Sequence, residues 1–201
     1  MSDEKSGGSG GGEVAYAYKP TLIGLPSEFV LTRDGLSWQV ARQSGRVPFS
    51  AIRRVRMSYR PATLQPHRFV TEIWSEGNPR LDISSTSWRS MVEQERADAA
   101  YNTFITELHR RIVKADAPAR LEQGSNAVLY WIGAALLAMA AVGLVAVTLR
   151  ALQTQAWSGA VFIGALAGYL VWQGGTFFRR NRPGRYRADA LPKAVMPSPR
   201  G

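Results

Sequence analysis

The chain has 201 residues, which is room for one soluble domain of ordinary size together with a short membrane-spanning part. It has no cysteine, which excludes a disulfide scaffold, a thiolate metal site and a cysteine nucleophile. Its net charge is +10, but residues 179–201 hold seven basic residues against one acidic residue. This uneven excess is typical of a membrane flank and does not indicate a nucleic-acid-binding surface.

The first stretch, residues 1–13, is rich in Gly and Ser. It has no basic start followed by an apolar core, so we expect no secretory signal there. Its composition predicts a flexible leader.

A series of short segments then alternates apolar and polar residues, which predicts strands joined by tight turns and paired antiparallel. Asp34-Gly35, the stretch Gln43–Arg46 around Gly45, and Gly77-Asn78-Pro79 are the predicted turns. The phase of the alternation shifts near Ile52, which predicts a bulge or a break. The segments are residues 13–19, 28–32, 36–40, 47–59, 69–73 and 81–83.

After these segments the apolar period changes from 2 to 3.6. Ser90-Met91-Val92-Glu93 matches a capping box, in which the Ser hydroxyl and the Glu carboxylate satisfy free amides of the first turn. The pattern predicts an amphipathic helix from Ser90 to Lys114 that covers one face or end of the sheet. Its apolar stripe consists of Ala97, Tyr101, Phe104, Ile105, Leu108 and Ile112.

Two uncharged stretches, 127–149 and 156–178, follow this helix. A helix as long as the first one reaches about 34 Å, enough to cross a hydrocarbon core of about 30 Å. Because only Arg150–Gln155 separates them, they predict an antiparallel transmembrane hairpin. The predicted organisation is a soluble domain over 14–118, a connector over 119–126, the hairpin, and a basic, proline-containing tail over 179–201.

The basic residues around the hairpin predict its orientation. Its short link carries one charge, Arg150, whereas both outer flanks are basic. By the positive-inside rule both chain ends face the cytoplasm. We therefore expect a two-pass protein of a bacterial inner membrane. The arginines after the second span are Arg179, Arg180, Arg182, Arg185 and Arg187.

Small residues are spaced by four along the second span, at Ala160, Gly164 and Gly168. Such a ridge lets helix backbones approach closely. One interpretation is that the ridge packs the two helices of a single hairpin. The alternative is homodimerisation through Gly164 and Gly168.

The segments TRDGLSW and GRVPFSAIRRVRMSY are similar to bacterial pleckstrin-homology-like (PH-like) domains attached to membrane helices. The matching positions are Asp34-Gly35, Val47-Pro48-Phe49, Ile52 and Val55, and the resemblance covers residues 14–115. It implies an α+β fold, an antiparallel PH-like β-meander or barrel capped by one C-terminal helix. It further implies a binding or scaffolding module rather than an enzyme. One departure is Trp88, which precedes the helix, where many PH domains carry a Trp inside it.

Arg54, Arg56 and Arg60 fall on one face of the segment 47–60, because alternate strand residues share a face. One interpretation is a cluster that grips lipid phosphates. The other is a solvated strand face whose charges pair with Glu72 across the sheet. The five arginines from Arg179 to Arg187 are further candidates for contact with anionic headgroups.

Nothing in the sequence indicates catalysis, a metal or a cofactor. His67 and His109 are the only histidines and show no ligand spacing. The run Ser84–Ser87 has neither a GxSxG nor an SxxK context, so it predicts a polar connection.

These observations predict a membrane-tethered, non-catalytic binding or scaffolding protein. Its expected partners are anionic lipid headgroups or another protein, without nucleic acid, and homodimerisation is an option. The alternative is an accessory subunit of a larger transport or envelope complex that binds through the transmembrane hairpin.

Overall fold

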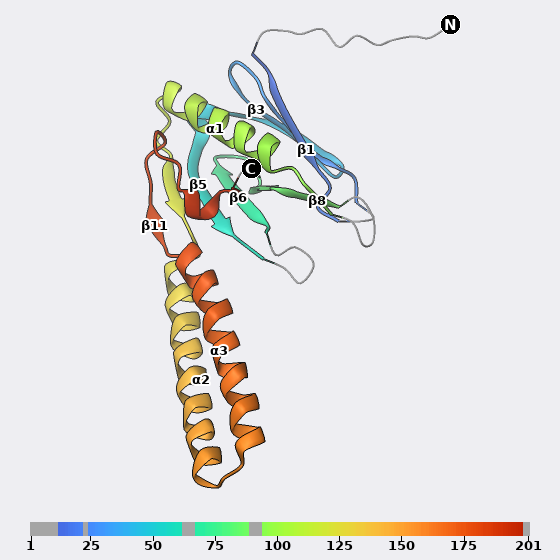
Figure 1. Cartoon of the computed structure of the whole chain (residues 1–201). Coiled ribbons are helices and arrows are strands. Elements are labelled where there is room, and N and C mark those ends of the chain that lie inside the picture. The colour runs from blue at the N-terminus through green and yellow to red at the C-terminus, as the bar shows by residue number, and fades with distance from the viewer. Residues whose placement is uncertain (1–11, 22–23, 62–66, 89–93, 199–201) are drawn as a thin grey trace, which may run out of the picture.

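The computed structural model describes residues 12–21, 24–61, 67–88 and 94–198, with the side chains of 94–96 left out. In these ranges the chain has an α+β fold with largely antiparallel sheets and three α-helices, two of them long and apolar. The two apolar helices extend side by side away from the sheets, whereas the third helix packs on the sheets (Figure 1).

The first sheet confirms the predicted early strands, which pair antiparallel in the order β1-β2-β3-β4. The predicted turn over Gln43–Arg46 is wrong, because these residues lie in β4. The chain instead turns at Ala41, whose φ is 54°. Gly45 faces Trp38, and a Cβ built on it would lie 2.8 Å from the indole ring, so it serves close packing and not a turn. The strands are β1 (Val14–Tyr18), β2 (Ser27–Leu31), β3 (Gly35–Val40) and β4 (Gln43–Pro48).

The predicted break near Ile52 is confirmed. A 3₁₀ turn, η1 (Phe49–Ala51), separates β4 from β5 (Ile52–Tyr59), and the register shifts between Ile52 and Arg54. β6 (Phe69–Ser75) pairs antiparallel with β5, and β7 (Leu81–Ser84) pairs antiparallel with β6, which continues the second sheet.

The predicted start of the amphipathic helix is wrong. α1 spans Asp98–Lys114, and β9 (Gln94–Arg96) before it pairs antiparallel with β8 (Thr86–Trp88). Pairing with a neighbouring strand overrides the helical pattern of this stretch. The capping box at 90–93 lies outside the described residues. The apolar stripe from Tyr101 to Ile112 is buried as predicted, against η1 and β1.

Two segments predicted as a connector and a tail instead supply strands. β10 (Arg120–Gln123) pairs in parallel with β5, and β11 (Gly184–Arg185) pairs antiparallel with β10. The second sheet therefore has the order β11-β10-β5-β6-β7. The long helices α2 (Ala127–Gln153) and α3 (Trp157–Arg180) lie between β10 and β11 in the chain, so the helical hairpin occupies the position of the loop in a β-hairpin.

The helical hairpin is packed through part of the predicted ridge. Ala160 is buried, and a Cβ built on Gly164 would lie 3.8 Å from Thr148 of α2. Gly168 is exposed, with no atom within 4 Å of such a Cβ. Contact positions between two packed helices recur about every seven residues, in steps of four and three. After Ala160 and Gly164 the next position on the packed side is therefore the half-buried Ala167, and not Gly168.

The segment after β11 returns to the core of the domain. Val195, in η2 (Lys193–Val195), is 1% exposed and belongs to the core, and Asn102 of α1 donates to the Pro197 carbonyl at 3.0 Å. His109 of α1 is fully buried. Its Nδ1 lies 2.7 Å from the Ile105 carbonyl and must donate there, so its Nε2 accepts from the Tyr186 hydroxyl at 2.7 Å. The predicted tail is thus part of the folded domain.

His109 makes the stability of the domain sensitive to acid. Burial lowers the pKa of His109 below its ordinary value, so the folded chain keeps this ring neutral where the unfolded chain takes up a proton. The stabilisation that the neutral His109 ring gives the folded domain is complete above about pH 6.5 and is lost as the pH falls below that value. We expect the unfolding temperature to fall between about pH 7 and about pH 5, and H109Q to flatten that slope.

Thermal unfolding of the wild type and of H109Q over this pH range gives the comparison. Parallel slopes for wild type and H109Q would contradict the assignment.

Candidate binding site at the junction of sheet and hairpin

β5 presents two of the three predicted arginines on the outer face of the second sheet. Val55 and Met57 point into the core and are fully buried, so Arg54 and Arg56 lie on the opposite face. Arg60 follows the end of the strand at Tyr59. The structure thus gathers Arg54, Arg56 and Arg60 along one side of the sheet, with a different partner for each.

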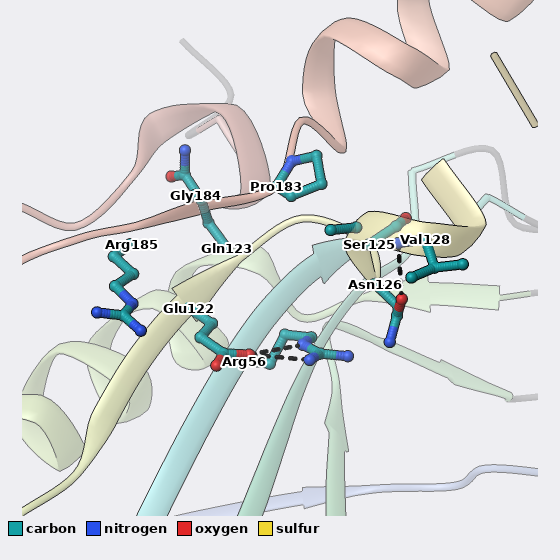
Figure 2. Close-up of a pocket in the computed structure, with 10 residues that line it drawn as sticks. Arg56, Glu122, Gln123, Ser125, Asn126, Val128, Pro183, Gly184 and Arg185 are labelled. Atoms are coloured by element: carbon teal, nitrogen blue, oxygen red, sulfur yellow. Dashed lines mark hydrogen bonds and ion pairs between the residues drawn. The ribbon is translucent and has the colours of Figure 1, made fainter. Parts of the chain in front are cut away.

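Arg54 and Arg56 are held by neighbouring strands. The Arg54 guanidinium stacks on the ring of Trp74 in β6, 3.8 Å from its centroid. Arg56 forms an ion pair with Glu122 of β10 at 2.8 Å, and both side chains are more than three-quarters buried (Figure 2). The parallel register of β10 creates this pair, because it places Glu122 opposite Arg56.

Glu72 of β6 is the most buried charge at the junction, with 2% of its side chain exposed. Its carboxylate accepts from Arg60 at 2.5 Å through one oxygen and lies 3.3 Å from Arg80 through the other. The predicted pairing with Glu72 is therefore confirmed for Arg60. Arg80 was not predicted, because only the register of β6 and β7 brings it near Glu72.

The arginines from Arg179 to Arg187, at and after the end of α3, fall into two groups. Arg180 lies over the ring of Tyr59 at 4.9 Å, against the end of β5. Arg187 pairs with Asp189 at 3.2 Å on the surface. Arg179, Arg182, Arg185 and Arg187 are all exposed, so most of this charge faces outward beside the hairpin.

Asn181, which sequence reasoning missed, connects the end of α3 to the sheet. Its side-chain amide donates to the Tyr59 carbonyl at 2.7 Å and accepts from the Tyr59 amide at 3.0 Å. Its own carbonyl accepts from the Ser125 amide at 3.0 Å. The fully buried Asn181 therefore satisfies both backbone groups of Tyr59, as a neighbouring strand would.

Two cavities open at this junction. The first, named the ribbon cavity because the β10–β11 ribbon lines it, has a volume of about 530 Å³ and is drawn in Figure 2. β10, β11 and the start of α2 line it, with Arg56, Glu122, Asn126 and Arg185. The junction cavity, of about 540 Å³, shares Arg56 and Asn126 with it and reaches the arginine pair on Glu72.

The residues that line the two cavities include four arginines and two glutamates, so positive side chains are in excess in the lining. No cluster of residues that could hold a metal ion occurs in the described part of the chain. Ser85, from the polar run predicted as a connection, is fully buried and its hydroxyl accepts from the Phe69 amide at 3.1 Å. The charged donors in the lining are the guanidinium groups of Arg56, Arg60, Arg80 and Arg185.

Comparisons with protein-family models, with curated proteins and with solved structures found no match for this chain.

The Asn181 interaction generates a stability prediction. Replacing Asn181 by Ala leaves a buried donor and a buried acceptor of Tyr59 unsatisfied, at a cost of about 2–4 kcal/mol in the free energy of unfolding. Asn78→Ala removes a comparable amide from an exposed turn, where it donates to the Glu76 carbonyl, and should cost less than about 1 kcal/mol. Denaturant unfolding in mild detergent measures both. Equal losses would show that Asn181 has no special structural role.

Proposed function

We propose that this chain is a two-pass inner-membrane protein whose cytoplasmic PH-like domain is a non-catalytic binding module for anionic lipid headgroups. The observation that carries the proposal is the position of the arginine face, which consists of Arg54, Arg56 and Arg60 on the outer side of the second sheet. Arg56 and Arg60 line a cavity whose other wall is built by α2 and α3, the two helices that would enter the bilayer.

The membrane part of the proposal is supported by the dimensions and surface of the hairpin. α2 and α3 have 27 and 24 residues, or about 40 and 36 Å. Both are long and apolar enough to cross a membrane, and their apolar windows are not buried in the structure. Trp131 and Trp172, near the ends that join the domain, are largely exposed, as expected of rings in the headgroup zone.

The PH-like part is supported by the order of elements. The seven strands β1 to β7 pair antiparallel in two sheets, and α1, which follows them in the chain, packs against β1. β10 and β11 are additions beyond the residues that carry the resemblance. They widen the second sheet toward the hairpin.

The orientation follows from the exposed charges. Arg179, Arg182, Arg185 and Arg187 lie at the end of the hairpin that joins the domain, whereas Arg150 is the charge near its distal turn. Arginines near a cytoplasmic leaflet gain about 1 kcal/mol each from anionic lipids. The domain then lies on the cytoplasmic side, with its arginine face at headgroup level.

A lipid-preference measurement tests the proposal. In mild detergent the wild type should bind phosphatidylglycerol in preference to phosphatidylcholine, and added salt should weaken that preference. The triple variant R179Q/R182Q/R185Q should lose several-fold in phosphatidylglycerol binding, because it removes exposed charge beside the hairpin. Native mass spectrometry of lipid titrations gives the comparison.

A matched variant separates position from total charge. R33Q/R42Q/R46Q removes the same charge around β3 and β4, at the end of the domain away from the hairpin (Figure 1), and should leave lipid preference unchanged. A wild type that shows no preference between the two lipids would refute the lipid-binding function.

Cysteine labelling tests the orientation, since the chain has no cysteine of its own. A cysteine introduced by Q153C, at the end of α2, should react with an impermeant maleimide on intact cells. Q39C, on the domain, should react only after lysis. The reverse pattern would place the domain outside.

A second function, as an accessory subunit that binds through the hairpin, is favoured by the open surface around Gly168. Its exposed backbone allows a second helix to approach closely. A stoichiometric membrane protein recovered with the full chain, and lost in a G168L variant, would support this function.

A further inference from the structure

We propose that the junction cavity binds the phosphodiester group of one anionic glycerophospholipid. The proposal rests on the membrane-tethered function above and deepens it, because it assigns one lipid to one site. The remaining arginines act only through general attraction to anionic headgroups.

The two walls of the junction cavity differ in chemistry. The sheet side supplies Arg56, Arg60 and Arg80 with the buried carboxylate of Glu72. The hairpin side is apolar and aromatic, with Leu129, Tyr130, Phe177 and Phe178. A headgroup joined to the start of two acyl chains has the same division into an anionic part and an apolar part.

The buried carboxylate positions the two outer guanidinium groups. Glu72 binds Arg60 through one oxygen and Arg80 through the other, so the two groups lie on either side of it. About half of each arginine side chain is exposed. Each guanidinium has five N–H donors, and the contacts with Glu72 leave several of them for a ligand.

Each arginine at the cavity has a carboxylate partner, so these arginines would act on a ligand as hydrogen-bond donors and not as unpaired charges. Arg56 pairs with Glu122, whereas Arg60 and Arg80 share the buried carboxylate of Glu72. Arg80 also pairs with Asp82 at 3.0 Å. One phosphodiester carries one negative charge and two oxygens free to accept bonds from both arginines.

The position along the hairpin favours a lipid over a soluble phosphate. Leu129 and Tyr130 lie in the first turn of α2, and Phe177 and Phe178 in the last turn of α3. In a two-pass chain these turns lie where the hydrocarbon core meets the headgroup region, a layer about 5–8 Å deep on each side. Soluble anions gain nothing from the aromatic wall.

The test uses the full chain in mild detergent, titrated with phosphatidylglycerol and followed by native mass spectrometry. The variant R60Q/R80Q/E72Q removes both arginines together with Glu72, so the most buried carboxylate is not left without its cations; Asp82, with 38% of its side chain exposed, loses its pair with Arg80. Its tightest bound lipid should be held at least about a hundredfold more weakly, the loss expected from two charge-assisted hydrogen bonds.

A matched control changes the same charges elsewhere. R46Q/R53Q/E76Q removes two arginines and one glutamate from surface ion pairs and should bind as the wild type does. Thermal unfolding verifies that each variant is folded.

The outcomes are distinct. If the wild type prefers phosphatidylglycerol but R60Q/R80Q/E72Q binds it equally well, the cavity is not the site, although the broader function stands. If the wild type shows no preference, the broader function fails as well. If inorganic phosphate displaces the lipid from the wild type at concentrations comparable with the lipid itself, the cavity binds soluble anions and the lipid assignment is overturned.

Discussion

The structure depends on the pairing of β10 with β11 and on the contact of Asn181 with Tyr59, since together these join the two ends of the helical hairpin to one sheet. The pairing of β10 with β11 spans two residue pairs, so its backbone hydrogen bonds alone supply little stabilisation. Asn181 adds two buried hydrogen bonds where the ladder stops, at the end of β5. Val195 then anchors the following segment in the core. The domain is therefore completed by residues on both sides of the hairpin in the sequence.

This topology determines how the hairpin and the sheet are connected. Residues 124–126 lead from β10 to α2, and residues 181–183 lead from α3 to β11, so neither side has a long linker. Gly124 adopts a φ of 79°, and a Cβ there would collide with the Asn181 and Arg182 carbonyls. Only glycine fits this crossing without strain. Since both connections are short, the arginine face is held beside the first turn of α2 and the last turn of α3, and the cavities between them follow from that arrangement.

Sequence reasoning found the elements whose patterns are local and missed those whose partners are distant. Alternation identified β1 to β3 and β5 to β7, and the apolar stripe identified α1, whereas most of β4 was predicted as a turn. The segment Arg120–Gln123 has no alternation to detect, and β11 has two residues, so both exist only through pairing with strands remote in sequence. Residues 94–96 also form a strand through pairing, although their partner β8 is close in sequence. At the candidate site, alternation placed Arg54 and Arg56 on one face, but Arg80, Glu122 and Asn181 required the register of the completed sheet.

The ion pairs at the junction show how burial decides the role of a charge. Arg56 and Glu122 are both largely buried and neutralise each other. This pair joins β5 to β10, and few of its hydrogen-bonding groups remain for a ligand. Glu72 is more deeply buried and is shared by two half-exposed arginines. Burying that carboxylate costs free energy that its cations offset, and removing either cation weakens the compensation. The arrangement therefore keeps Arg60 and Arg80 together while their outer N–H groups stay open to solvent. An anion at that position would accept bonds from these N–H groups, and under the proposed lipid site the apolar wall across the cavity favours an anion that carries hydrocarbon.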